Sequence, residues 1–328
     1  MSPSLSAESA STSSRKSSGK ASSSASAKAA KTTFSRLIGR CRKADERLLS
    51  LDILKAEISR SFKSQRAFWF VPDRNIVRGL ATGQPLESYF GQFSNIRKDE
   101  IHFGQGETLQ DTSAMVSLFL DVLVLRLYDE EKLYEFARYS KIPIVNGLTN
   151  ESHPCQVLTD VFTFQEIRGS ITGKKVVWLG VANNVFQSFL HAAVAFNFHI
   201  VFSGPEKFQP SEKMLKFIEK NNFNLFTIEP NPITAVENAD LVVTDKWVSM
   251  HDSELPKSDL EDLAKFRVTQ KLLGFAKMEV LFMHCLPAER GQEVSEDIFK
   301  DKRCVVLQEA ENRMHVQKSI LRWCLGLF

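Results

Sequence analysis

The sequence predicts an α/β protein with two lobes, each built on parallel strands, and a helix that joins them. The first observation is a βαβ pattern, in which apolar runs at 120–128 and 142–148 flank residues 129–140, which have helical spacing. The second is that the same alternation of apolar runs and helical segments resumes after residue 175. The third is the segment 152–167, which indicates a connecting helix between the two sets, with a cleft beside it.

Each element of the second lobe follows from its own pattern. The runs VVWLG and FHIVFSG, at 176–180 and 198–204, predict buried parallel strands on either side of a helix at 183–196. The connecting helix is expected to start at Ser152 and Pro154, because proline favours the first helical turn. Its apolar positions are Val157, Leu158, Val161, Phe162 and Phe164. Further strands are expected at the runs ADLVVTD, MEVLFMH and RCVVLQ.

Composition narrows the classes of function. The chain has 328 residues, of which 43% are hydrophobic and 25% charged, so it can bury one core or two. No apolar run is long enough to span a membrane, and the small net charge of +3 is concentrated near the N-terminus, so neither a membrane span nor a nucleic-acid groove is expected. Five cysteines without a CxxC pair argue against a disulfide framework and favour a reducing compartment.

Residues 1–33 are dominated by Ser, Ala and Lys, so this leader is expected to be disordered. Glu8 is the only acidic residue before Asp45, whereas basic residues accumulate over the same stretch. A serine-rich, basic and acid-poor leader is typical of an organellar transit peptide, and a mitochondrial location is therefore expected. The alternative is a disordered cytoplasmic tail or a basic arm that contacts an anionic partner.

The segment MHCLPAERGQEV, at 283–294, combines a histidine and a thiol at one point. It continues the apolar run from Val280, so His284, Cys285 and Leu286 are expected at the carboxyl end of a strand, where open α/β sheets bind ligands. Four other segments, NGLTNESHPCQVLTDVFTFQE, VWLGVANNVFQSFL, LVVTDKWVSM and EAENRMHVQKSIL, occur in a fixed order around it. Together the five segments resemble the aspartate/ornithine carbamoyltransferases, and specifically the ornithine branch.

The resemblance implies an α/β fold of two doubly wound parallel-sheet domains joined by a connecting helix. Residues 34–150, completed by a C-terminal helix at 312–328, correspond to the carbamoyl-phosphate-binding domain. Residues 151–311 correspond to the ornithine-binding domain. The resemblance also implies a homotrimer or a subunit of a larger assembly, and chemistry that requires neither a metal nor an organic cofactor.

The resemblance assigns roles to individual residues. Those implied for the carbamoyl and phosphate groups are Arg126, His153, Gln156 and Arg313. Those implied for ornithine are Asn183 or Asn184, Asp245, Ser249 and Met250 at its backbone end, with Cys285 and Leu286 facing its side-chain amine. A structural role is the alternative for several of them: Asn184 as a helix cap, Asp245 in a turn, Cys285 as an apolar filler and His153 at a helix start.

The carbamoyl phosphate half departs from the family pattern. The family signature Ser-Thr-Arg-Thr-Arg supplies hydroxyl and guanidinium donors to phosphate at the start of a helix. Here its positions fall on Arg74, Asn75, Ile76, Val77 and Arg78, so only the last arginine is kept. Losing three hydrogen bonds to a charged group costs roughly 4 to 9 kcal/mol, so weak binding of carbamoyl phosphate is expected.

The sequence alone therefore favours an ornithine carbamoyltransferase-like protein that is inactive or severely impaired and that has a structural or interaction role. One alternative is an active ornithine carbamoyltransferase, which makes citrulline from carbamoyl phosphate and ornithine. A second alternative is an amino-acid sensor that uses only the ornithine half of the site.

A fusion of residues 1–45 to a fluorescent reporter tests the leader. We expect import into mitochondria, because the segment is basic and nearly free of acidic residues. Imaging measures the location, and the matched control replaces Arg15, Lys16 and Lys20 by glutamine. A diffuse cytosolic signal from the unaltered fusion contradicts the expectation.

Overall fold

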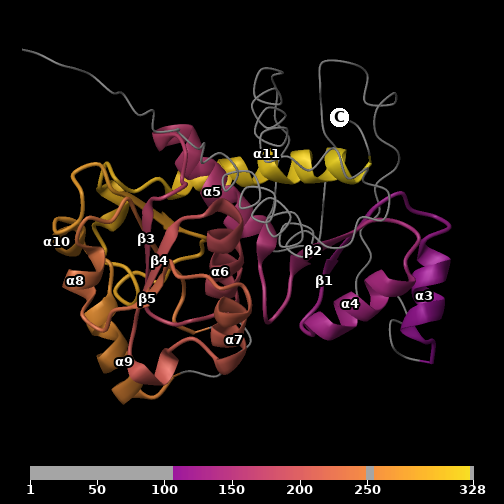
Figure 1. Ribbon diagram of the computed structural model, residues 1–328, viewed down its shortest axis with the longest axis horizontal. Coiled ribbons are helices and arrows are strands. Elements are labelled where there is room, and N and C mark those ends of the chain that lie inside the picture. Colours follow the sequence, from indigo (N-terminus) through magenta and orange to yellow (C-terminus); the bar gives the residue numbers. More distant parts are fainter. Residues whose placement is uncertain (1–105, 249–254, 326–328) are drawn as a thin grey trace, which may run out of the picture.

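The structure, a computed structural model, describes residues 106–248 and 255–325 (Figure 1). The leader and the segment 74–78 lie outside the described residues, and so do Ser249 and Met250. In chain order the elements are α3 (Leu109–Val116), β1 (Leu123–Arg126), α4 (Glu130–Tyr139), β2 (Ile144–Leu148), α5 (Pro154–Arg168), β3 (Lys175–Leu179), α6 (Asn184–Phe196), β4 (His199–Ser203), η3 (Glu206–Phe208), α7 (Glu212–Lys220), β5 (Phe226–Ile228), α8 (Pro232–Val236), β6 (Leu241–Thr244), α9 (Lys257–Leu263), η4 (Ala264–Phe266), α10 (Gln270–Leu273), β7 (Leu281–His284), η5 (Ile298–Lys300) and α11 (Val306–Cys324).

Two parallel sheets confirm the predicted α/β class. Strands β1 and β2 pair in parallel across α4, as the βαβ pattern predicts. The second sheet has the strand order β5-β4-β3-β6-β7, and all of its pairings are parallel. None of the helices in the described part of the chain has both the length and the apolarity that crossing a lipid bilayer requires.

The larger sheet is buried on both faces, as a doubly wound sheet must be. Along β3, Val176 and Trp178 belong to one apolar cluster, and Val177 and Leu179 belong to the other. This division follows from the period of two along a strand, which sends neighbouring side chains to opposite faces. Helices α5, α6 and α7 cover the first face, and α8 and α10 cover the second. The result is two apolar layers around one sheet.

Helix α5 lies between the two sheets, where the sequence predicts a connecting helix (Figure 1). Its residues Val157, Leu158, Val161 and Phe164 are buried, in agreement with the predicted apolar stripe. The helix begins at Pro154, with His153 as its N-cap, and the Ser152 hydroxyl donates to the Glu130 carboxylate instead of capping the helix. Helix α11 packs along α5 and continues toward the smaller sheet.

One predicted strand is wrong. The run RCVVLQ forms no strand; Cys304 makes only an isolated bridge to Phe282, and Val306 already begins α11. The helix is favoured because Val316, Ile320 and Trp323 continue the apolar pattern at helical spacing. Their side chains are buried in the apolar cluster that α5, α6 and α7 form with the larger sheet, which we call the first core. Conversely, β5 was not anticipated, since it is a three-residue edge strand without a fully buried side chain.

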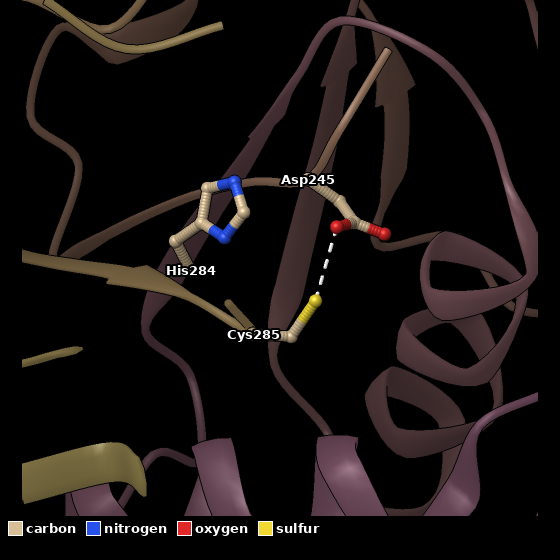
Figure 2. Close-up of side chains that lie close together, drawn as sticks. All are labelled: Asp245, His284 and Cys285. Carbon is tan, nitrogen blue, oxygen red and sulfur yellow. Dashed lines mark hydrogen bonds between the residues drawn. The ribbon is translucent and has the colours of Figure 1, made fainter. Parts of the chain in front are cut away.

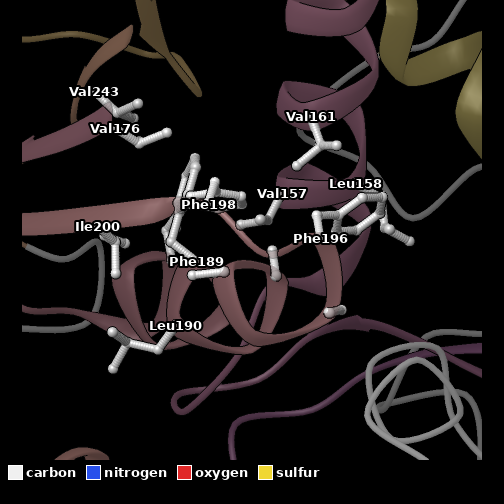
Figure 3. Packing of buried hydrophobic residues seen from close by; sticks show 14 of the residues in the cluster. Val157, Leu158, Val161, Val176, Phe189, Leu190, Phe196, Phe198, Ile200 and Val243 are labelled. Carbon is white, nitrogen blue, oxygen red and sulfur yellow. The ribbon is translucent and has the colours of Figure 1, made fainter. Parts of the chain in front are cut away.

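Replacing Phe189 by alanine tests the first core. Phe189 is fully buried, lies 5.7 Å from the Trp178 ring between centroids, and sits among the apolar residues of α5, α6 and the sheet (Figure 3). We expect the free energy of unfolding to fall by about 3 to 5 kcal/mol, because the substitution leaves a cavity. Urea unfolding measures this change in the free energy of unfolding. Phe275→Ala, at a side chain that is 44% exposed, is the control and should cost less than about 1 kcal/mol; equal losses contradict the assignment.

Candidate active site

The site begins where the order of the larger sheet reverses. After β3 the chain moves outward to β4, and after β6 it moves outward to β7 on the other side, so a crevice opens between the carboxyl ends of β3 and β6. Asn183 follows β3 and Asp245 follows β6. Asn183 Nδ2 donates a hydrogen bond of 2.6 Å to Asp245 Oδ2 across this crevice. Two predicted site residues therefore meet at the ligand-binding edge.

The orientation of Asn183 follows from its position at the start of α6. Its Oδ1 accepts from the backbone N–H groups of Val185 and Phe186, at 3.0 and 3.1 Å, and so caps the helix. With the amide oxygen engaged, Nδ2 is left to face Asp245. The helix-cap alternative for Asn184 is therefore wrong. Asn184 Nδ2 instead donates to the Thr149 carbonyl at 2.8 Å and links the two lobes.

Cys285 stands directly after β7, as the sequence predicts. Its Sγ donates to Asp245 Oδ1 at 3.0 Å (Figure 2). Burial, and then the Asp245 carboxylate, raise the pKa of the Cys285 thiol well above its ordinary value. The side chain is therefore a neutral hydrogen-bond donor at physiological pH, which suits binding and orientation rather than nucleophilic attack.

Asp245, His284 and Cys285 each offer a possible metal-ligand atom, and these atoms lie within 4.8 Å of one another. Both ring nitrogens of His284 are already engaged, however. Nδ1 accepts from the backbone N–H of Leu286 at 3.0 Å, and Nε2 lies 3.3 Å from Glu293 Oε1. A protonated thiol is also a poor ligand. The arrangement therefore favours a hydrogen-bonded cluster over a metal centre.

Two cations from other elements, Arg126 at the end of β1 and Arg313 on α11, act on His153 at the start of α5. His153 is buried at the first turn, and its pKa lies well below the ordinary value because of burial and because of the positive charges of Arg313 and Arg126. The imidazole is therefore neutral at physiological pH. Its Nδ1 has no hydrogen-bond partner among the described residues, so it can pair with a bound ligand. His153 is the N-cap residue of α5, as its structural alternative predicts, and its backbone N–H donates to Ser188 Oγ at 2.8 Å, but its side chain makes no cap hydrogen bond.

Gln156 and Arg313 are joined directly. Arg313 Nη1 donates to Gln156 Oε1 at 2.7 Å, and this contact brings α11 onto the start of α5. Gln156 Nε2 donates to Asp160 and to Glu309, each at 2.7 Å. Sequence reasoning missed these two carboxyl groups. The available signal was the i, i+4 spacing of Gln156 and Asp160, which places two polar side chains on one face of a buried helix.

Replacing Asp245 by asparagine should increase the reactivity of Cys285. The substitution removes the negative charge that raises the pKa of the thiol, although the contribution of burial remains. Each unit by which the pKa falls increases the thiolate fraction about tenfold. Iodoacetamide labelling with peptide mass spectrometry measures the rate at Cys285, and the half-buried Cys304 is the internal control. An unchanged rate at Cys285 contradicts the role given to Asp245.

Two family models match the chain. Residues 87–166 match the carbamoyl-P binding domain of aspartate/ornithine carbamoyltransferase, and residues 172–324 match its Asp/Orn binding domain. The match begins after the segment 74–78, which therefore lies outside it.

Similar proteins come from bacteria, archaea and fungi. The ornithine carbamoyltransferase of Ruegeria pomeroyi is 46% identical over 72% of this chain and 77% of its own length. That of Paracoccus denitrificans is 45% identical over the same shares. Among solved structures, the Pyrococcus furiosus ornithine carbamoyltransferase covers 70% of this chain and 74% of its own, with a TM-score of 0.65 and 37% identity. The structure of a mitochondrial ornithine carbamoyltransferase from Coccidioides immitis matches 69% of this chain and 72% of its own length, with a TM-score of 0.61 and 31% identity. Because both domain models match in the family's order and the relatives are this similar, the chain belongs to the aspartate/ornithine carbamoyltransferase family.

Proposed function

We propose that the protein is an active ornithine carbamoyltransferase, which transfers the carbamoyl group of carbamoyl phosphate to the side-chain amine of ornithine and forms citrulline. The observation that carries this proposal is that the charges of Arg126 and Arg313 act on the buried, neutral His153 before α5, while Arg313 also donates to Gln156 on the same helix. The Asp245–Cys285 pair stands at the carboxyl edge of the larger sheet. One half suits an anionic carbamoyl donor, and the other suits an amine.

The cationic half supports the transition state of the transfer. When the amine attacks the carbonyl carbon, negative charge develops on the carbamoyl oxygen and on the departing phosphate. Donors that are fixed in advance stabilise that charge without reorganising during the reaction. In the proposed role, Arg126 and His153 contact the carbamoyl oxygen, and Arg313 stands toward the phosphate.

The other half supports the amino acid. Asp245 offers a carboxylate for the ammonium group at the backbone end of ornithine, and Asn183 holds that carboxylate in place. The protonated Cys285 thiol and Leu286 face the side-chain amine. Because the thiol stays neutral, the proposed reaction is a direct transfer to ornithine, without a covalent enzyme intermediate.

The expectation of an inactive protein rests on Ile76 and Val77, which lie outside both the described residues and the matched segment. Relatives named ornithine carbamoyltransferase, at 43 to 46% identity, favour activity instead. Donors from other residues or from a neighbouring subunit then complete the phosphate site. The sensor alternative requires ornithine binding without turnover.

A citrulline assay with both substrates in large excess tests the proposal. We expect turnover by the unaltered protein, and a loss of about 10²- to 10³-fold in kcat for Arg313→Met, which removes one charged donor. Lys302→Met, at an exposed cation in the turn between η5 and α11, is the matched control and should keep full activity.

Binding measurements separate the alternatives. A phosphonate bisubstrate analogue that joins the ornithine and carbamoyl phosphate halves should bind several decades more tightly than ornithine. Equal affinities and no citrulline indicate a sensor. No binding of either compound indicates a structural role, and both results contradict the proposed activity.

A further inference from the structure

Behind Gln156, two carboxyl groups lie against each other in the interior. Asp160 on α5 and Glu309 on α11 are each 1% exposed. Gln156 Nε2 donates to both of them, at 2.7 Å each, so the two carboxyl groups lie side by side. Two carboxylates buried side by side repel each other, and a proton on one of them relieves that repulsion.

The buried charges agree with a single proton. Arg313 donates to Gln156, whose amide nitrogen contacts both carboxyl groups, and its positive charge acts on each of them. With one proton on the pair, one negative charge balances the guanidinium. Burial raises the pKa of Asp160 to about 7 and raises the pKa of Glu309 well above its ordinary value. Both directions favour a protonated pair.

The hydrogen-bond donors around the pair locate the proton. Glu309 Oε1 accepts from Gln156, and its Oε2 accepts from the backbone N–H of His284 at 3.0 Å. Both Glu309 oxygens therefore face N–H donors, as a carboxylate requires. Asp160 accepts from Gln156 at Oδ1, and within the described chain no N–H group donates to its Oδ2. Oδ2 is thus the oxygen that can carry the proton toward Glu309.

We infer that Asp160 is a positioning residue that acts as a carboxylic acid: it donates to the Glu309 carboxylate and so holds the amide of Gln156 with its oxygen toward Arg313. This inference rests on the proposed function, because it gives the pair the task of orienting Gln156 and Arg313 for the transfer. When the proton is lost, the two carboxylates repel each other and attract the guanidinium, and Arg313 leaves the orientation that the reaction needs.

Other charged and titratable groups face the pair from each neighbouring element. Asp245, after β6, adds a negative charge that favours the proton, whereas Arg313 on α11 opposes it. Cys285, after β7, remains a neutral thiol. The folded-state pKa values of both carboxyl groups are raised, so protonation of the pair stabilises the fold fully below about pH 4. The contribution of Asp160 is lost as the pH rises through about 7, and that of Glu309 is lost as the pH rises through its own raised pKa.

Two conservative substitutions distinguish the residues of the pair. Asp160→Asn keeps an acceptor for Gln156 and replaces the acid proton by an N–H donor, so kcat should stay within about tenfold of the unaltered protein. Its kcat should also lose the alkaline decline that deprotonation of the pair causes. In Glu309→Gln the new NH₂ group replaces one of the two Glu309 oxygens, and each of these oxygens accepts an N–H group, from Gln156 or from His284. Two donors then face each other, so kcat should fall by about 10²-fold with a small change in KM. The kcat of Asp160→Ala should fall by the same factor, so the asparagine variant should retain the activity that the alanine variant loses.

Infrared spectroscopy tests the proton independently of turnover. The unaltered protein should show the carbonyl band of a buried carboxylic acid near neutral pH, and Asp160→Asn should remove it. Asp259→Asn, at a buried aspartate that is paired with Lys207, is the matched control and should keep the band. If no citrulline forms but the band behaves in this way, the proposed function fails and the protonated Asp160 stands. A band that survives Asp160→Asn, or a greater kcat for Glu309→Gln than for Asp160→Asn, overturns the inference.

Discussion

The parallel pairing of β3 with β6 is the constraint on which the site depends. Because the chain leaves these strands in opposite directions, their carboxyl ends are the one place in the larger sheet where the following segments separate. Gly180 makes the turn after β3 with φ of 106°, and any side chain there would meet the indole of Trp247 at 2.9 Å. The turn therefore needs glycine, and it delivers Asn183 to the top of α6 facing Asp245.

Two neutral acids in the interior give the site its electrostatic character. Cys285 is held as a thiol and the Asp160–Glu309 pair retains a proton, because burial penalises the charged form in each case. A buried polar network of this kind is stable only when its donors and acceptors are matched. Its advantage is rigidity, since each side chain that faces the crevice is itself held by a neighbour.

Elements with strong local patterns could be predicted from the sequence, and so could the residues at their ends. The strand pattern predicts Cys285 at the carboxyl edge of the sheet, and the family resemblance implies that Asp245 shares a ligand with it; the two side chains are in contact. The partners of Gln156 could not be predicted, because Glu309 is 153 residues away and no local pattern links it to α5. Short-range ambiguity explains the remaining errors, since Val305 and Val306 fit either a strand or the first turn of α11.

The contacts of α11 with α5 also bear on how the molecule assembles. The hydrogen bonds of Gln156 to Glu309 and to Arg313 close loops of 153 and 157 residues. Closing such loops costs conformational entropy that only tertiary packing can offset, and contacts of this range form late in folding. The larger sheet can assemble from nearer neighbours while the chain is being synthesised, whereas the Gln156–Arg313 contact of the candidate site forms only once α11 is present. A partly synthesised chain is thus folded in its sheet while still chemically incomplete.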